Sequence, residues 1–206
     1  MKKHWIIAAA LGMAVSLPAL AQDKVKLVDV VELSGAGATA GTNWKNGIDL
    51  AVADINAKGG ILGKQIEIVH YDTQTNPGNT RAAVQRAIDE GTYAVLGPVF
   101  SGPIGASMQI AQRAEIAQLV GGEAAGLTKQ GNQYIFRTSL SQAAAMPKIA
   151  NYLKNTVKAN SVAVVWVNND FGKGGRDAII PELEKVGIKV AADVSTEQGQ
   201  ADFSAD

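Results

Sequence analysis

The chain contains no cysteine, which excludes a disulfide framework and any metal site built on thiolates. It has no excess of either charge, since 19 Lys and Arg residues balance 19 Asp and Glu residues. Nothing in this balance indicates a basic surface for nucleic acid. The sequence also lacks G-x-S-x-G, H-E-x-x-H and any paired metal ligands. We therefore expect no nucleic-acid partner, no cofactor and no bound metal.

Long apolar runs are missing everywhere except at the N-terminus. Residues 1–21 begin with Lys2 and Lys3, continue with an apolar core and end in Ala-Leu-Ala. That order is typical of a cleavable signal peptide, and the core is shorter than the roughly 20 residues of a transmembrane anchor. We therefore expect an exported, soluble protein, and a bacterial periplasm fits the absence of cysteine.

Strand-like and helix-like segments alternate along the rest of the chain. The predicted strands of the first series cover residues 24–33, 65–72, 93–97 and 115–122, and the predicted helices begin at residue 43 and cover 80–90 and 104–113. This alternation predicts an α/β fold, a parallel sheet with helices on both faces. A second series follows an irregular stretch, with helices over 142–157 and 173–186 and strands over 161–167 and 188–194. We expect a first lobe over 22–137 and a second lobe over 138–206 that stops before its sheet is complete.

A glycine-rich stretch, SGAGATAG at residues 34–41, follows the first predicted strand. Gly35 and Gly37 fit the dinucleotide fingerprint G-x-G-x-x-G, with Ala40 as a permitted variant at the third position. The acidic residue expected about 20 positions later is missing, because Asp72 comes more than 30 positions on. The stretch is therefore interpreted as a sharp turn that brings the backbone to the rim of a cleft, with a turn that meets no ligand as the alternative.

A stronger candidate site is LGPVFSGPIGA, residues 96–106. We expect Pro103 at the first position of a helix, where its missing N–H costs nothing. Backbone N–H groups and the Ser101 hydroxyl would then meet at a helix N-terminus, which favours an anion. The alternative is that Ser101 only caps the helix. The local sequence does not distinguish between an anion-binding role and a helix-capping role for Ser101.

Loops after parallel strands meet at one edge of a sheet, where ligands bind. Residues 34–41, 99–102 and 121–123 should therefore line one rim, and residues 168–175 should face it from the second lobe. A cleft between two lobes is a default small-molecule site. Glu123 and Asp170 could form a carboxylate pair across the cleft, and an enzyme that uses Asp170 or Glu123 is a weaker alternative. His70 lies within a predicted strand and is expected to be a packed residue there.

Several runs in order resemble the branched-chain amino-acid-binding proteins, the periplasmic receptors of ABC importers. They are GIDLAVADINAKGGILGKQIEIVHYDTQTNPGNTRAAVQRAI, LGPVFSG, LTKQGNQYIFRTS and NDFGKGG. The resemblance covers essentially all of the chain after the signal peptide. It implies the type I periplasmic-binding-protein fold, two doubly wound parallel-sheet lobes joined by a hinge, in a family whose members are considerably longer.

The resemblance also implies roles for residues. Val99, Phe100 and Ser101 match the loop that holds the α-carboxylate and α-amino groups of the ligand. Gly121 and Glu123 match a second loop, in which the family often has a small residue followed by Thr or Ser. Glu123 departs from that pattern, and would either meet the ammonium group directly or indicate a different ligand.

In the second lobe, Phe171 matches an aromatic residue that closes over the ligand. Ala40 stands where some relatives have an aromatic side chain, which implies a wider pocket. The implied protein is a nonenzymatic, monomeric binder of an amino acid or related small carboxylate, and its partner is the membrane permease of an ABC importer. A ligand-sensing domain of a receptor is the alternative.

Overall fold

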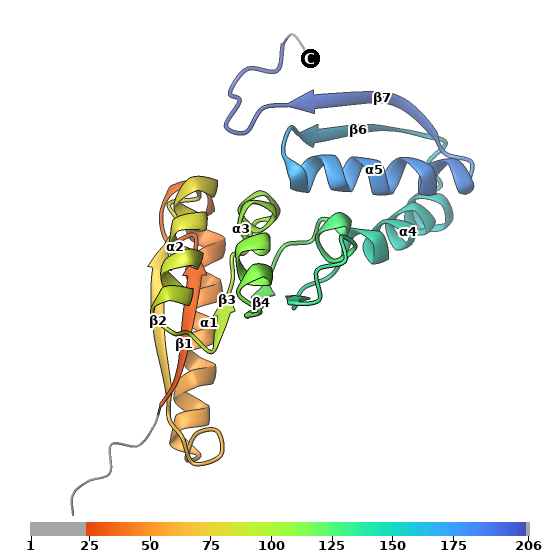
Figure 1. The fold of residues 1–206 in the computed structure, drawn as a ribbon. Coiled ribbons are helices and arrows are strands. Elements are labelled where there is room, and N and C mark those ends of the chain that lie inside the picture. Colours follow the sequence, from red (N-terminus) through yellow and green to blue (C-terminus); the bar gives the residue numbers. More distant parts are fainter. Residues whose placement is uncertain (1–23, 205–206) are drawn as a thin grey trace, which may run out of the picture.

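The computed structural model describes residues 24–204, and the predicted signal peptide lies outside them (Figure 1). The strands are β1 Val25–Val31, β2 Ile66–Asp72, β3 Ala94–Leu96, β4 Ala117–Val120, β5 Ile135–Arg137, β6 Ser161–Val167 and β7 Lys189–Thr196. The α-helices are α1 Ala38–Ala57, α2 Pro77–Asp89, α3 Ser101–Arg113, α4 Gln142–Tyr152 and α5 Asp170–Lys185. Three short helical turns are η1 Gly35–Gly37, η2 Ala125–Thr128 and η3 Leu153–Val157.

The strands form two parallel sheets. The first has five strands in the order β2-β1-β3-β4-β5, and the second pairs β6 with β7. In the first sheet Val28 lies between Val69 of β2 and Val95 of β3. A parallel sheet covered on both faces needs such apolar strands. The α/β fold with parallel strands that the sequence predicts is confirmed.

Helices cover both faces of the five-stranded sheet, because successive residues of a strand point to opposite sides. Val28 and Val30 of β1 are fully buried in a core that includes Val84 of α2 and Ala111 of α3. The residue between them, Asp29, accepts a hydrogen bond from Trp44 Nε1 of α1 (3.0 Å). Helices α2 and α3 therefore lie on one face and α1 on the other.

Several helices begin earlier than the sequence predicts, and asparagine caps define two of these starts. The Asn76 side chain accepts hydrogen bonds from the N–H groups of Gly78 and Asn79, so α2 begins at Pro77. The Asn169 side chain accepts one from Gly172 N–H, so α5 begins at Asp170. Helix α1 likewise begins at Ala38, inside the stretch that we expected to be a turn.

The second sheet has its own small core. Ala150 of α4, Leu183 of α5 and Ile188 are almost completely buried together, and α4 and α5 pack side by side. The segment between β5 and α4, residues 138–141, connects the two sheets (Figure 1). Within residues 24–204, no helix combines the length and apolar character that crossing a membrane requires.

Candidate functional site

A groove of about 400 Å³ lies between the two sheets. It is lined by Thr75, Pro77, Val99, Phe100, Ser101, Gly102, Pro103, Gly121, Glu123, Asn169, Phe171 and Gln198. All of these residues follow the carboxyl ends of parallel strands, as the general rule for α/β sheets requires. We call the nine residues of the five-stranded unit the first wall, and Asn169, Phe171 and Gln198 the second wall.

The structure brings all six residues of the predicted site together in this groove. Val99, Phe100, Ser101, Gly121 and Glu123 belong to the first wall, and Phe171 belongs to the second. Sequence reasoning missed Thr75 and Gln198, which lie on loops whose paths depend on tertiary packing, and Pro77, the first residue of α2. Asn169 lies inside the predicted rim segment 168–175, but its cap role was not foreseen.

The loop after β3 is held from behind by Glu32, at the end of β1. The N–H groups of Val99 and Phe100 donate to the two oxygens of its carboxylate, both at 3.1 Å. Glu32 is 0% exposed, and this burial raises the pKa of its carboxyl, although the two N–H groups oppose the shift. These two N–H groups thus already have an acceptor within the protein, and the role of Val99 and Phe100 in holding a ligand stays a prediction.

Ser101 is the first residue of α3, and it does not cap the helix. The residue before the helix is Phe100, which makes no side-chain cap bond, and Pro103 is the third helical residue and not the first. Ser101 Oγ accepts a hydrogen bond from Ala124 N–H (3.2 Å), so its own hydroxyl proton can still be donated. The N–H groups of Ser101 and Gly102 are at the start of the helix, where no intrahelical acceptor exists. The anion site that this geometry permits therefore consists of these two N–H groups and the Ser101 hydroxyl.

The loop after β4 packs tightly against this helix because it contains glycine. A Cβ on Gly122 would lie 2.4 Å from Ile104 Cδ1 and 3.2 Å from Ser101 Cα. Arg137 donates from its two terminal nitrogens to the carbonyls of Gly122 and Ala124, both at 2.8 Å. Its pKa is lowered by burial, and the nearby Glu123 charge opposes that shift. Glu123, between the two bound carbonyls, is thereby fixed at the groove.

The electrostatic character of the groove follows from a single side chain. Among the twelve residues that line it, Glu123 is the one with a charge, and most of the remaining surface is apolar. Phe171 of the second wall is 46% exposed, which leaves its ring available to cover an apolar group. A ligand that fits such a groove has an apolar part, an anion for the start of α3 and a cation for Glu123.

The glycine-rich stretch does not line the groove, and this corrects the sequence expectation. Asp72 accepts hydrogen bonds from Leu33 N–H and from both the N–H and the hydroxyl of Ser34, at 2.6–3.1 Å. Thr75 Oγ1 accepts from Gly37 N–H (2.9 Å) and donates to the Ser34 carbonyl (2.7 Å). The stretch thus supports Thr75 of the first wall from behind. The Asp72 carboxylate binds the backbone and hydroxyl of this turn, whereas the acidic residue of a dinucleotide-binding fold would bind a ribose.

Ala40 likewise contributes nothing to the groove lining. His70 lies in β2, away from the groove. Its Nδ1 is 2.7 Å from Asp29 Oδ2 and its Nε2 is 2.8 Å from Asp49 Oδ1. It thus belongs to the packing between the sheet and α1. No group of three or more His, Cys, Asp or Glu residues that could hold a metal ion occurs within residues 24–204.

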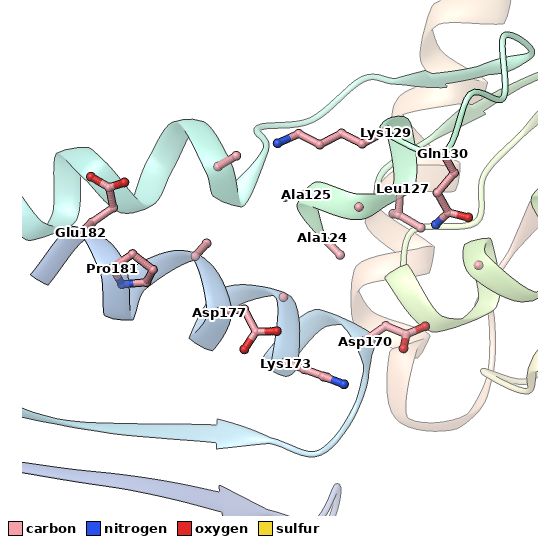
Figure 2. Close-up of a pocket in the computed structure, with 15 residues that line it drawn as sticks. Ala124, Ala125, Leu127, Lys129, Gln130, Asp170, Lys173, Asp177, Pro181 and Glu182 are labelled. Carbon is pink, nitrogen blue, oxygen red and sulfur yellow. The ribbon is translucent and has the colours of Figure 1, made fainter. Parts of the chain in front are cut away.

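A second pocket of about 600 Å³ lies on another side of the junction between the sheets. Figure 2 shows it between α5, which carries Asp170, Lys173 and Asp177, and the segment from Ala124 to Gln130. Asp170 lines this pocket and Glu123 lines the groove. The two residues of the carboxylate pair that the sequence allowed therefore line two different hollows.

Comparison with known proteins decides the family. The sequence profile described as periplasmic binding protein matches residues 24–205. The chain belongs to the periplasmic binding protein family. Within it, the Leu/Ile/Val-binding protein of Escherichia coli (strain K12) is 32% identical over 205 residues, 99% of this chain and 56% of that protein. The leucine-specific-binding protein of Salmonella typhimurium (strain LT2) is 31% identical over 99% of this chain and 55% of its own length. The chain thus spans about half the length of the curated relatives it matches.

Solved structures of the family share the fold. The branched-chain amino acid transporter substrate binding protein LivJ from Streptococcus pneumoniae, in complex with isoleucine, has a TM-score of 0.79 and 28% identity, over 89% of this chain and 52% of that one. A solute binding protein from R. palustris, in complex with 4-hydroxybenzoate, has a TM-score of 0.79 and 25% identity, over 88% and 49%. The fold is that of the type I periplasmic binding proteins, as the sequence predicts. These relatives are binding proteins and not enzymes.

Proposed function

We propose that this protein is a periplasmic solute-binding protein of an ABC importer, and that it captures an α-amino acid in the groove between two lobes. The first lobe comprises residues 22–137 and the second comprises residues 138–206. The observation that carries the proposal is that one groove, between the carboxyl ends of two parallel sheets, is lined by all six predicted residues. A cleft of this kind is where α/β proteins bind small molecules.

The ligand carboxylate is assigned to the start of α3. The N–H groups of Ser101 and Gly102 and the Ser101 hydroxyl can all donate to it, and the helix dipole adds a favourable field. Ser101 is only 1% exposed, so these bonds would form largely away from competing water. The apolar part of the ligand would lie against Phe100, Val99 and Phe171.

Glu123 favours an amino acid over an aromatic acid. Relatives of known structure hold either kind of ligand, isoleucine in one case and 4-hydroxybenzoate in another. An α-ammonium group would compensate the Glu123 carboxylate, whereas a benzoate would bring a second negative charge into a groove lined by no other charged residue. Like charges at close range disfavour binding.

Export and transport complete the proposal. The signal peptide predicted over residues 1–21 would deliver the protein to the periplasm, where a membrane permease would recognise its ligand-bound form. Binding to both walls would favour a closed arrangement, because a ligand shifts a conformational equilibrium only through contacts that differ between the two states. A monomer suffices for this mechanism.

The test is calorimetric titration of the purified protein with leucine, isoleucine and 4-hydroxybenzoate. Ser101→Ala should weaken amino-acid binding by about 10- to 100-fold, the effect of one lost hydrogen bond to a charged group. The matched control is Ser107→Ala, which removes a buried hydroxyl from the same helix outside the groove. Equal affinity of wild type and Ser101→Ala for every amino acid that binds would refute the assignment of the site.

A further inference from the structure

Gln142 lies where the two walls meet. It is the first residue of α4 and is only 2% exposed. Its backbone N–H donates to the Glu123 carbonyl (2.9 Å), and its side-chain Nε2 donates to the Phe171 carbonyl (2.8 Å). One residue is therefore hydrogen-bonded to a groove residue of each wall.

The connection is firmly attached to the first wall. Four successive carbonyls of the loop after β4 accept hydrogen bonds from the end of β5, the segment 138–141 and the start of α4. They are Gly121 from Ser139 Oγ (2.6 Å), Gly122 from Arg137 Nη1 (2.8 Å), Glu123 from Gln142 N–H (2.9 Å) and Ala124 from Arg137 Nη2 (2.8 Å). Gln142 thus projects toward α5 from a backbone that follows the first wall.

The α5 side of the connection is closely packed. A Cβ on Gly174 would lie 2.8 Å from Gln142 Oε1, and one on Gly175 would lie 3.1 Å from its Nε2. The absence of side chains at these two positions lets α5 approach the amide. Gln142 Oε1 accepts no hydrogen bond within the described part of the chain. A buried acceptor without a partner costs free energy that methionine or leucine would avoid. The favourable contribution of the amide is thus its bond to Phe171.

We propose that Gln142 is a positioning residue that sets the spacing between the two walls and so holds Phe171 over the groove. It acts through Phe171 and does not line the groove itself. The spacing is a property of the free protein. The consequence for affinity depends on the function proposed above.

The substitution that tests this is Gln142→Met, which keeps the length of the side chain and removes the donor. Gln118→Met is the matched control. Gln118 is also buried, and its Oε1 has no hydrogen-bond partner within residues 24–204. Its Nε2 donates to the Gly97 carbonyl (3.1 Å) and to Ser107 Oγ (3.3 Å), but all three residues belong to the five-stranded unit. Because the chain has no cysteine, spin labels can be attached at Arg81→Cys and Ser195→Cys, two exposed positions on different units.

Without ligand, Gln142→Met should broaden the distribution of label distances and move it to longer values, whereas Gln118→Met should match wild type. Amino-acid affinity should fall about fivefold in Gln142→Met, the effect of one neutral hydrogen bond. A distance distribution of Gln142→Met that coincides with wild type would overturn the proposal, whether or not any ligand binds. If only the proposed function were wrong, neither wild type nor any variant would bind an amino acid, but the label distances of Gln142→Met would still differ from those of wild type.

Gln142→Glu provides a second test if the methionine variant fails to fold. A carboxylate cannot donate to the Phe171 carbonyl, but a protonated carboxyl can, and burial favours protonation. The label distances of Gln142→Glu should therefore be long at pH 7.5 and return toward the wild-type distribution near pH 5. Wild type and Gln118→Met should show no such change. Distances in Gln142→Glu that equal those of wild type at a pH where the introduced carboxyl is ionised, as its infrared absorption shows, would equally refute the proposal.

Discussion

Replacement of Glu32 by glutamine should make the protein more stable and a weaker binder. Two effects oppose each other at this carboxylate. Burial disfavours its charge, while the N–H groups of Val99 and Phe100 stabilise that charge. Burial is the larger effect, so the pKa of Glu32 is raised. The neutral amide removes the cost of burying a charge, and we therefore expect Glu32→Gln to melt at a higher temperature than wild type at pH 7.

Affinity should change in the opposite direction. A carboxylate accepts from both N–H groups, but an amide has one oxygen, so its NH₂ group must face the other N–H. The loop that places Ser101 then loses one of its two anchors. We expect ligand affinity to fall about 5- to 10-fold, which corresponds to about 1–1.4 kcal/mol. Glu32→Ala leaves both N–H groups unpaired, at about 1–3 kcal/mol each, so it should lose about 2–6 kcal/mol of stability as well as affinity.

The assay is thermal unfolding between pH 4 and pH 8, together with calorimetric titration at pH 7. A carboxyl whose pKa is raised by folding contributes stability that is complete below its unfolded pKa, near 4.5, and is lost as the pH rises through the folded pKa. Glu32→Gln should lack that part of the pH dependence and should approach wild type at the acidic end. A glutamine variant that is less stable than wild type at pH 7 would show that the hydrogen bonds outweigh burial. Unchanged affinity in both variants would refute the role of Glu32 in placing the loop.

Two further predictions concern the supports of the first wall. Burial opposes the ionisation of Asp72, but hydrogen bonds from Ser34, Gln74 and Leu33 outweigh it and lower the pKa of Asp72. Asp72 therefore contributes stability above its unfolded pKa of about 3.8 that is lost as the pH falls through the folded pKa, and Asp72→Asn should remove this acid dependence and lower the urea midpoint at pH 7. Gly122→Ala should cost about 1–3 kcal/mol in urea denaturation, because its Cβ would overlap Ile104. Gly126→Ala, whose Cβ would meet nothing within 4 Å, is the control, and equal losses in the two alanine variants would contradict the packing argument.

The order of strands along the chain was sufficient to predict which loops line the groove. Parallel strands end at one edge, so Val99, Ser101 and Glu123 could be assigned to a common rim before their contacts were known. Phe171 could be placed opposite them by the same rule, because it follows β6 in the second sheet. The topological rule does not depend on the details of packing, and this is why it succeeded.

The supports of the rim could not be predicted in the same way. Glu32 stands at the end of an apolar run, and its sequence position does not reveal that its carboxylate turns inward to the loop after β3. Gln142 connects residues 19 positions before it and 29 positions after it, so its role exists only in the folded chain. By contrast, Asn76 followed by Pro77 is a recognisable helix start that the sequence interpretation missed. A helix start depends on neighbouring residues and can be predicted from the sequence, whereas hydrogen bonds between residues far apart in the chain cannot.

The two walls differ in how they are held, and this difference indicates which of them responds to a ligand. The first wall is preorganised, because Glu32, Ser139 and Ala124 are hydrogen-bonded to its polar groups. Preorganised contacts raise affinity, but contacts that are equal in the open and closed states cannot drive closure. Phe171 belongs to α5 and Asn169 caps it, and this helix reaches the first-wall loop through the amide of Gln142. Under the proposed function, the energy that closes the groove would come from the ligand's contacts with the second wall, and the first wall would determine which chemical group is held.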